Sequence, residues 1–262
     1  MTRKTFATFA AVFIMLLVSL LNTDNALACL TARANHDHIT IDFFYNGSEV
    51  SVRGISDPDV DLVVKITSPD GHQDLKEKGK VAGALWMNVG TLKFEDTPNL
   101  YMLQCTKKPE EILSASEMEK YCIGFPALEK HVGISPVESE ADRSKWFGEF
   151  LKFKQSKNLY FAADGGFGPN PDKPDQHGYY MKFAWPYQAP PGDYLVTVYA
   201  VKDHKVVETA TSKVTVEQVG AVKALANMAK NNAALYGILS VLSALGAGFG
   251  VGIVFGKGGG AH

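Results

Sequence analysis

The densest group of possible metal ligands in this sequence is His36-Asp37-His38. Side chains alternate along an extended strand, so His36 and His38 would lie on the same face. Two imidazoles suit a transition metal, but two ligands do not complete a site. The remaining ligands cannot be placed, because the other histidines of the domain are scattered: His72, His131, His177 and His204. The pair is therefore either part of a metal site or a solvated entrance to a strand.

Cys105 and Cys122 are the second chemically distinctive pair. An oxidising compartment would favour a disulfide between them, which would join the end of a strand to the end of a helix. Two free thiols are the alternative. A bridge closing so short a loop would contribute about 3 kcal/mol in the chain-entropy model.

The sequence has no recognisable catalytic motif. It contains no C-x-x-C-H, H-E-x-x-H or G-x-S-x-G pattern. The glycine-rich run Gly165-Gly166-Phe167-Gly168 lacks the Lys-Ser/Thr that would follow in a phosphate-binding loop. The net charge of −2 argues against nucleic acid as a partner. We expect a protein that is not an enzyme and that carries no cofactor.

The N-terminus predicts export. Arg3 and Lys4 precede an apolar stretch over residues 6–21, and Ala26-Leu27-Ala28 has the form of a cleavage site, so residues 1–28 are predicted to be a signal peptide. An uncleaved first anchor is one alternative. Lipidation of Cys29 after cleavage is another.

The C-terminus predicts one membrane span. No charged residue occurs between Lys230 and Lys257, and residues 233–255 are long and apolar enough for a transmembrane helix. Residues 256–262 would then form a short cytoplasmic tail. Together with the signal peptide, this predicts a single-pass protein of the bacterial inner membrane with most of its chain in the periplasm.

Small residues recur every fourth position in this span: Ser240, Ala244, Gly248, Gly252 and Gly256. Such a face lets two helix backbones approach closely, whereas a simple anchor needs only hydrophobicity. A second small pair, Gly246 and Gly250, lies on roughly the opposite side. We therefore favour a helix that packs against a transmembrane partner over a plain anchor.

A further helix is predicted over residues 218–232, with Val222, Leu225, Ala226 and Ala229 on one side. Lys223 and Lys230 would lie near lipid headgroups. We expect this juxtamembrane helix to continue into the span as a rigid stem.

Residues 29–217 predict a domain of mainly β structure: an immunoglobulin-like antiparallel β-sandwich with a helical insertion at about 107–158. Short alternating strands, separated by turn residues, are expected at 38–42, 49–55, 60–66, 85–94, 100–106, 179–185, 194–201 and 206–216. Asn46-Gly47 predicts a hairpin between the first two. In the insertion, helices are expected at 109–121 and 139–157. The second has an aromatic face, expected to be core: Trp146, Phe147, Phe150 and Leu151.

Several sequence blocks resemble the alphaproteobacterial transmembrane family Alph_Pro_TM. They run in one order along nearly the whole mature chain: Ile39-Thr40-Ile41, Tyr45-Asn46-Gly47-Ser48-Glu49, Val52-Arg53-Gly54, residues 61–66 with Ser68-Pro69, Leu85-Trp86-Met87-Asn88, residues 94–101, Pro191-Gly192-Asp193-Tyr194 and Ala234-Leu235-Tyr236-Gly237. The resemblance implies an exported domain with one C-terminal span, in a family often described beside sulfite-exporter-like permeases. It carries over no catalytic residue, and the cysteine pair and the segment at about 164–180 match no pattern of the family.

Two functions follow as expectations. The first is a non-enzymatic accessory or interaction subunit of a membrane complex, with a transmembrane partner such as a sulfite-exporter-like permease. The second is a periplasmic receptor domain that binds a ligand or a metal. Its site would involve His36 and His38 or an aromatic segment: Tyr179, Tyr180, Trp185 and Tyr187.

Overall fold

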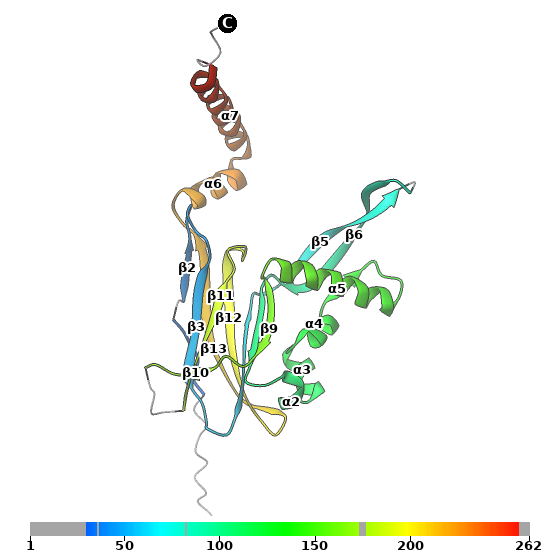
Figure 1. Cartoon of the computed structure of the whole chain (residues 1–262), viewed down its shortest axis with the longest axis vertical. Helices are drawn as coiled ribbons and strands as arrows, with labels where there is room; N and C mark the ends of the chain where they lie inside the picture. Colours follow the sequence, from blue (N-terminus) through cyan, green and yellow to red (C-terminus); the bar gives the residue numbers. More distant parts are fainter. Residues whose placement is uncertain (1–29, 36, 82, 173–176, 257–262) are drawn as a thin grey trace, which may run out of the picture.

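The computed structural model describes residues 30–256 except for residues 36, 82 and 173–176. The predicted signal peptide, Cys29, His36 and the tail beyond Gly256 lie outside the described residues. The described chain is predominantly β, as expected, with helices grouped in the middle of the sequence and at its C-terminal end (Figure 1).

Two sheets pack against each other to form the domain. The six-stranded sheet has the order β2 (His38–Ile41), β13 (Lys205–Gln218), β12 (Gly192–Lys202), β4 (Asp61–Thr67), β7 (Tyr101–Cys105) and β9 (Tyr160–Asp164). The four-stranded sheet has the order β1 (Arg33–Ala34), β3 (Ser48–Ile55), β11 (Gly178–Trp185) and β10 (Gly168–Pro169). The eight predicted strands are all present, with bounds close to those expected.

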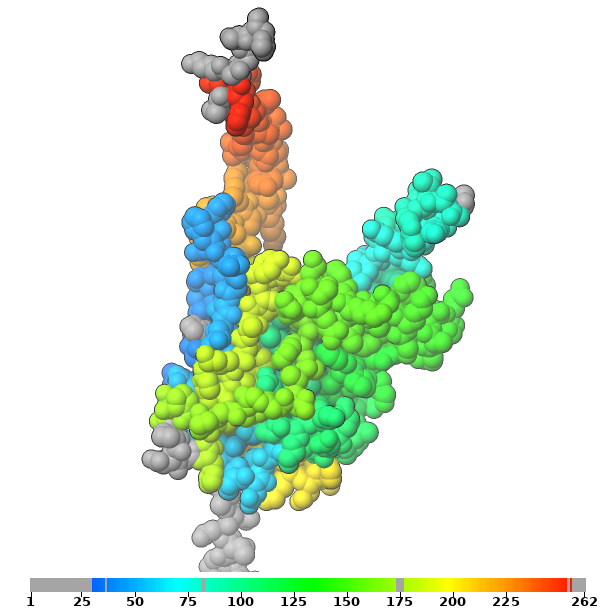
Figure 2. Space-filling view, in the orientation of Figure 1, coloured from blue at the N-terminus to red at the C-terminus, as the bar shows by residue number. Residues whose placement is uncertain are grey.

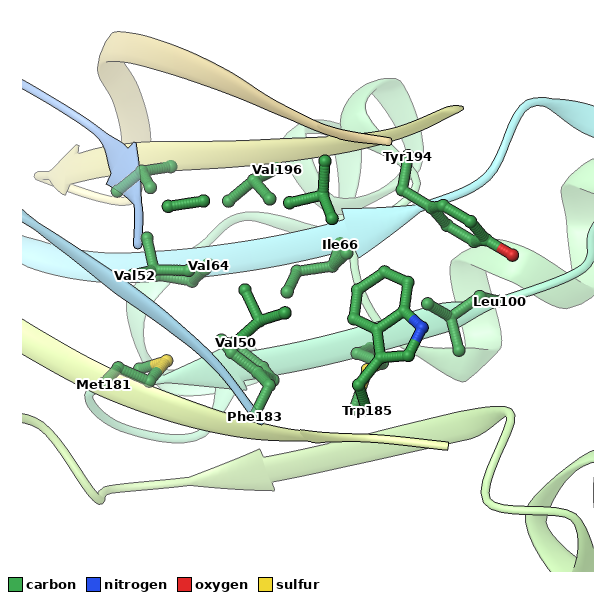
Figure 3. Close-up of a cluster of buried hydrophobic side chains, with 14 of the residues drawn as sticks. Val50, Val52, Val64, Ile66, Leu100, Met181, Phe183, Trp185, Tyr194 and Val196 are labelled. Atoms are coloured by element: carbon green, nitrogen blue, oxygen red, sulfur yellow. The ribbon is translucent and has the colours of Figure 1, made fainter. Parts of the chain in front are cut away.

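The core between the sheets follows from the period-2 alternation. Val50, Val52 and Phe183 from the four-stranded sheet face Val64 and Ile66 from the six-stranded sheet (Figure 3). Trp185 packs edge-on against Tyr194, with ring centroids 4.8 Å apart. This contact closes the core at one end.

Two predictions about strand pairing are wrong. Asn46-Gly47 does not close a hairpin: β2 pairs with β13 in one sheet, and β3 pairs with β1 and β11 in the other. The loop between β2 and β3 therefore crosses from sheet to sheet. The sheet is also not purely antiparallel, because β2 runs parallel to β13, and β9 runs parallel to β7.

The helical insertion covers the outer face of the six-stranded sheet. It contains α2 (Pro109–Ile112), α3 (Ala115–Tyr121), α4 (Phe125–His131) and α5 (Glu140–Ser156). Ser139 caps α5 by accepting a hydrogen bond from the amide of Asp142, as the sequence predicts. The aromatic face of α5 is core: Phe147 and Phe150 are buried, and the ring of Phe150 stacks on Phe94 at 4.5 Å. Trp146 and Leu151 are half-buried beside them.

A long hairpin projects from the domain between β4 and β7 (Figures 1 and 2). Its strands are β5 (Asp70–Val81) and β6 (Leu85–Pro98), and β8 (Gly133–Ser135) adds a third strand at its root. The sequence predicts β6 but not β5. Only the root of the hairpin packs on the domain, through Leu92 and Phe94.

Two helices complete the chain: α6 (Gly220–Asn231) and α7 (Ala233–Gly256). Strand β13, which lies next to the edge strand β2 of the six-stranded sheet, runs almost directly into α6. In Figure 1, α7 points away from the domain.

Candidate functional site: the spanning helix and the end of the domain beside it

Helix α7 has the dimensions of a membrane span. Residues 233–253 are long and apolar enough to cross a bilayer, and none of their most apolar stretch is buried against the rest of the chain. Large apolar side chains such as Ile238, Leu242 and Phe249 are exposed around the helix. Within the described chain, α7 therefore has neighbours only near α6, and lipid or another helix must cover the remainder.

The predicted packing face lies on this exposed helix. Ser240, Ala244, Gly248 and Gly252 are all exposed, and Gly256 is the last residue of α7. A methyl group added at Gly248 or Gly252 would meet no other atom within 4 Å. The hydroxyl of Ser240 donates to the carbonyl oxygen of Tyr236 at 2.8 Å, so its polarity is satisfied within the helix. The face is thus shallow and open.

The predicted continuous stem is wrong. Asn232 has φ −138° and ψ 56°, which is not helical, so α6 ends there and α7 begins at the next residue. Helix α6 is therefore a separate amphipathic helix, with Leu225 exposed and with Lys223 and Lys230 on its polar side. Such a helix suits a position in the plane of the membrane interface.

Two phenylalanines lie beside the start of α6. The amide of Val219, the residue before α6, donates to the carbonyl oxygen of Ile41 at the end of β2. The next residues along that loop include Phe43 and Phe44, which are 74% and 86% exposed. We call this region, residues 42–47 with α6, the membrane-proximal end. Exposed phenylalanines beside the start of an amphipathic helix that leads into a span are well placed to meet lipid.

The hairpin β5–β6 carries a second exposed apolar group, which the sequence analysis did not identify. Its outer part, residues 76–81 and 85–91, is here called the hairpin tip. It exposes Leu85, Trp86 and Met87 by 66%, 67% and 52%. The signal available in the sequence was the alternation of Lys76, Lys78 and Lys80, which marks one solvent-exposed strand face.

The four residues of the aromatic segment that was predicted as a ligand site do not share one surface in the fold. Tyr179 and Trp185 are core residues, and the Tyr179 hydroxyl donates to the carbonyl oxygen of Thr31 at 2.6 Å. Tyr180 points to the opposite face of β11, and Tyr187 is exposed.

A groove of about 590 Å³ runs between β9 and the end of β11. Its lining includes Asn46, Tyr160, Phe161, Lys182, Trp185 and Tyr187. The groove combines aromatic walls with the amides of Asn46 and Asn158 and with Lys182, whose ammonium lies 2.7 Å from Glu49 Oε1. This composition suits a small organic ligand, or an anion that replaces Glu49 on Lys182.

The imidazole of His38 is paired with a carboxylate and is not a free metal ligand. Its Nε2 lies 3.0 Å from Glu217 Oε1 on the neighbouring strand β13, and Glu217 also faces Lys223 at 3.8 Å. His36 is outside the described residues. Among the residues that are described, no group of three or more His, Cys, Asp or Glu side chains is arranged to hold a metal ion.

Cys105 and Cys122 are both free thiols in the structure, so the predicted disulfide is not formed. Cys105 is buried at the end of β7, where burial raises the pKa of its thiol to about 12. Cys122 caps α3 in the left-handed conformation, and its carbonyl oxygen accepts a hydrogen bond from Tyr101. Tyr101 lies four residues before Cys105 on β7, a spacing of about 13 Å along a strand. The C-terminal end of α3, with Cys122, is therefore docked over the Tyr101 end of β7 and not over the Cys105 end.

One buried cation lies under the helical layer. Lys154 on α5 is 2% exposed, and its ammonium lies 5.3 Å from the ring centroids of both Phe150 and Tyr160. Burial lowers the pKa of Lys154 to about 8. The two rings offset part of this cost, because a cation is attracted to an aromatic face.

The comparison with protein families agrees with a membrane-spanning C-terminus. No curated protein matches the chain. The model of the family Alph_Pro_TM, described as "Putative transmembrane protein", matches residues 29–257, which cover the whole β domain, α6 and α7. The apolar C-terminal helix agrees with the single span that the resemblance implied, and the chain belongs to this transmembrane family.

Proposed function

We propose that this protein is a non-enzymatic accessory subunit of a membrane complex. Its partner would be a transmembrane protein, and the first candidate is a multi-span permease of sulfite-exporter type. The β domain, which we infer to be a variant of the immunoglobulin-like sandwich, would stand in the periplasm. Helix α7 would cross the inner membrane and pack against the partner.

The open face of small residues on α7 is the observation that carries this proposal. Helices in a bilayer gain little from hydrophobicity, since lipid tails are as apolar as leucine. They associate where small side chains allow close backbone contact. Gly248 and Gly252 supply such a surface, and nothing in the described chain covers it. A partner helix would fill it.

The test compares two pairs of glycines on the same helix. Full-length tagged protein is purified from its native membrane in mild detergent, and the proteins that accompany it are identified and quantified. We expect a stoichiometric multi-span protein with the wild type and its loss in Gly248→Leu/Gly252→Leu. Gly246→Leu/Gly250→Leu is the matched control, because it adds the same volume on roughly the opposite face and should keep the partner.

Two results would refute the proposal. A wild-type protein that is recovered alone would leave α7 as an anchor. Equal recovery of the partner with both glycine pairs would show that this face does not make the contact.

The groove beside Tyr187 favours a second candidate, a periplasmic receptor domain. Calorimetric titration of the full-length protein with small anions such as sulfite and sulfate, and with divalent metal ions, tests it. Binding that is abolished by Lys182→Ala and Phe161→Ala would support a receptor. The absence of heat with every probe would count against it.

A further inference from the structure

The hairpin tip gathers several exposed apolar side chains of the described β domain, and the proposed function does not use it. Five large apolar side chains are exposed there: Val81, Leu85, Trp86, Met87 and Val89. The inner part of the tip, at Glu77, Gly90 and Thr91, borders a pocket shared with Trp146, and none of the five apolar residues lines that pocket. Figure 2 shows this segment standing clear of the domain. Contiguous exposed apolar side chains of this kind mark a site of interaction.

The two faces of the tip differ in chemistry. Lys80 pairs with Trp86 across the hairpin, and Lys78 pairs with Asn88, so lysines and tryptophan share one face. The Lys80 ammonium lies 5.5 Å from the centre of the Trp86 ring. The opposite face holds Met87 with Leu85, and Gly79 lies against Val89. The tip is therefore an apolar surface edged by lysines and a tryptophan.

Charge is distributed unequally along the hairpin. The tip carries Lys76, Lys78 and Lys80 against Glu77 alone, a formal charge of +2. The root carries four carboxylates, at Asp70, Asp74, Glu95 and Asp96, against Lys93, a formal charge of −3. The positive charge is thus concentrated where the apolar side chains are. An anionic surface would attract the tip and repel the root.

The position of the tip relates it to the membrane. The hairpin leaves the sandwich after Thr67 and returns at Tyr101, at the same end of the sheet as the β2–β3 loop and the start of α6. Figure 1 shows its tip at about the level of α6, on the side toward which α7 extends. A bilayer crossed by α7, with α6 in its interface, would have its surface at this level.

We infer that the hairpin tip is a second membrane contact, inserted into the headgroup region of the leaflet in which α6 lies. Leu85, Met87 and Val89 would enter the acyl boundary. Trp86 would lie in the interface, where tryptophan is enriched, and the lysines would face the phosphates of anionic lipids. The ligand is a lipid surface, so this contact requires no protein partner.

The experiment uses the fluorescence of Trp86 in the full-length protein. The purified protein is reconstituted into vesicles in which part of the lipid carries bromine atoms in its acyl chains, which quench nearby tryptophans. Because quenching occurs from either leaflet, mixed orientation of the protein does not matter. The chain has three tryptophans. We expect the wild type to be quenched, Trp86→Phe to lose most of this quenching, and Trp146→Phe, the matched control on α5, to keep it.

A second arm tests the headgroup. We expect stronger quenching with phosphatidylglycerol in the vesicles than with phosphatidylcholine alone, and Lys76→Gln/Lys78→Gln/Lys80→Gln should remove this difference. Equal quenching of the wild type and Trp86→Phe would overturn the inference. This assay contains no partner, so its failure is distinct from failure of the co-purification experiment.

Discussion

The amide of Val219 donates a hydrogen bond to the carbonyl oxygen of Ile41 at 3.0 Å, which joins the residue that begins the C-terminal helices to the strand that precedes Phe43 and Phe44. Residues near the two ends of the domain sequence thus meet at a single point. The parallel pairing of β2 with β13 brings them there. As a result, the loop with the two phenylalanines and helix α6 leave the sheet side by side and form one structural unit.

Because of this unit, we expect the protein to bind membranes weakly even when the span α7 is removed. We expect residues 30–231 to sediment with vesicles through α6 and Phe43 and Phe44. Phe43→Ser/Phe44→Ser should lower the bound fraction at least about tenfold, because each phenylalanine contributes more than about 1.4 kcal/mol when removed from water. Val207→Ser, an exposed apolar residue near the opposite end of β13, is the control and should bind like the wild type. Equal binding of all three proteins would place the loop away from lipid.

Gly54 on β3 should tolerate no side chain. A methyl group there would overlap the carbonyl oxygen of Thr31 and lie 2.6 Å from the Tyr179 hydroxyl. We expect Gly54→Ala to destabilise the domain by more than about 4 kcal/mol, or to prevent folding. Gly148→Ala is the control: it lies in α5 with open space around it, and should stabilise by up to about 1 kcal/mol. Thermal unfolding in detergent measures both, and a mild effect at Gly54 would contradict the close packing of Thr31 on β3.

The Tyr101 hydroxyl connects the six-stranded sheet to the helical layer. It donates to the carbonyl oxygen of Cys122 and accepts from the amide of Gly124 at 2.8 Å. Tyr101→Phe would leave this buried amide without its partner, at a cost of about 1–3 kcal/mol. We expect a lower unfolding temperature for Tyr101→Phe and no change for Tyr187→Phe, whose hydroxyl is exposed. An unchanged midpoint for Tyr101→Phe would show that another group satisfies the amide.

Lys154 should make stability depend on pH in the alkaline range. Its pKa is about 8 in the folded protein and near 10.5 when exposed. Between these values the unfolded chain binds more protons, so stability should rise with pH by at most about 1.4 kcal/mol per unit. Lys154→Met should flatten this slope between pH 8 and 10, measured by thermal unfolding. Lys152→Met, exposed on the same helix, should leave it unchanged. A slope that persists in Lys154→Met would assign it to other groups.

Strands that bury one face were predictable from the sequence. In β3 and β11 every second residue is apolar and enters the core, and the alternation fixes each strand to within about two residues. The span and the cap of α5 followed from equally local signals. These elements can be predicted from a short stretch of sequence, because burial and capping depend on residues that are close together in the chain.

Pairing and exposure were harder to predict. Asn46-Gly47 indicates a turn, but a turn does not specify whether the next strand stays in the same sheet. Strand β5 was missed because its outer half has no core to face, so it contains lysines and glycine rather than a run of apolar residues. The break at Asn232 was also missed, since only one residue between two helix-forming segments departs from helical geometry.

The direct run of β13 into α6 also has a mechanical consequence. A pull on the C-terminal helices along the axis of β13 would load a strand that is paired with β12 over eleven residue pairs and with β2 over four. Under a force in this direction, the hydrogen bonds between β13 and its two neighbours share the load. They must break together, rather than one after another. A movement of the span would therefore be passed to the whole sandwich as a rigid displacement, with little of it absorbed by local unfolding.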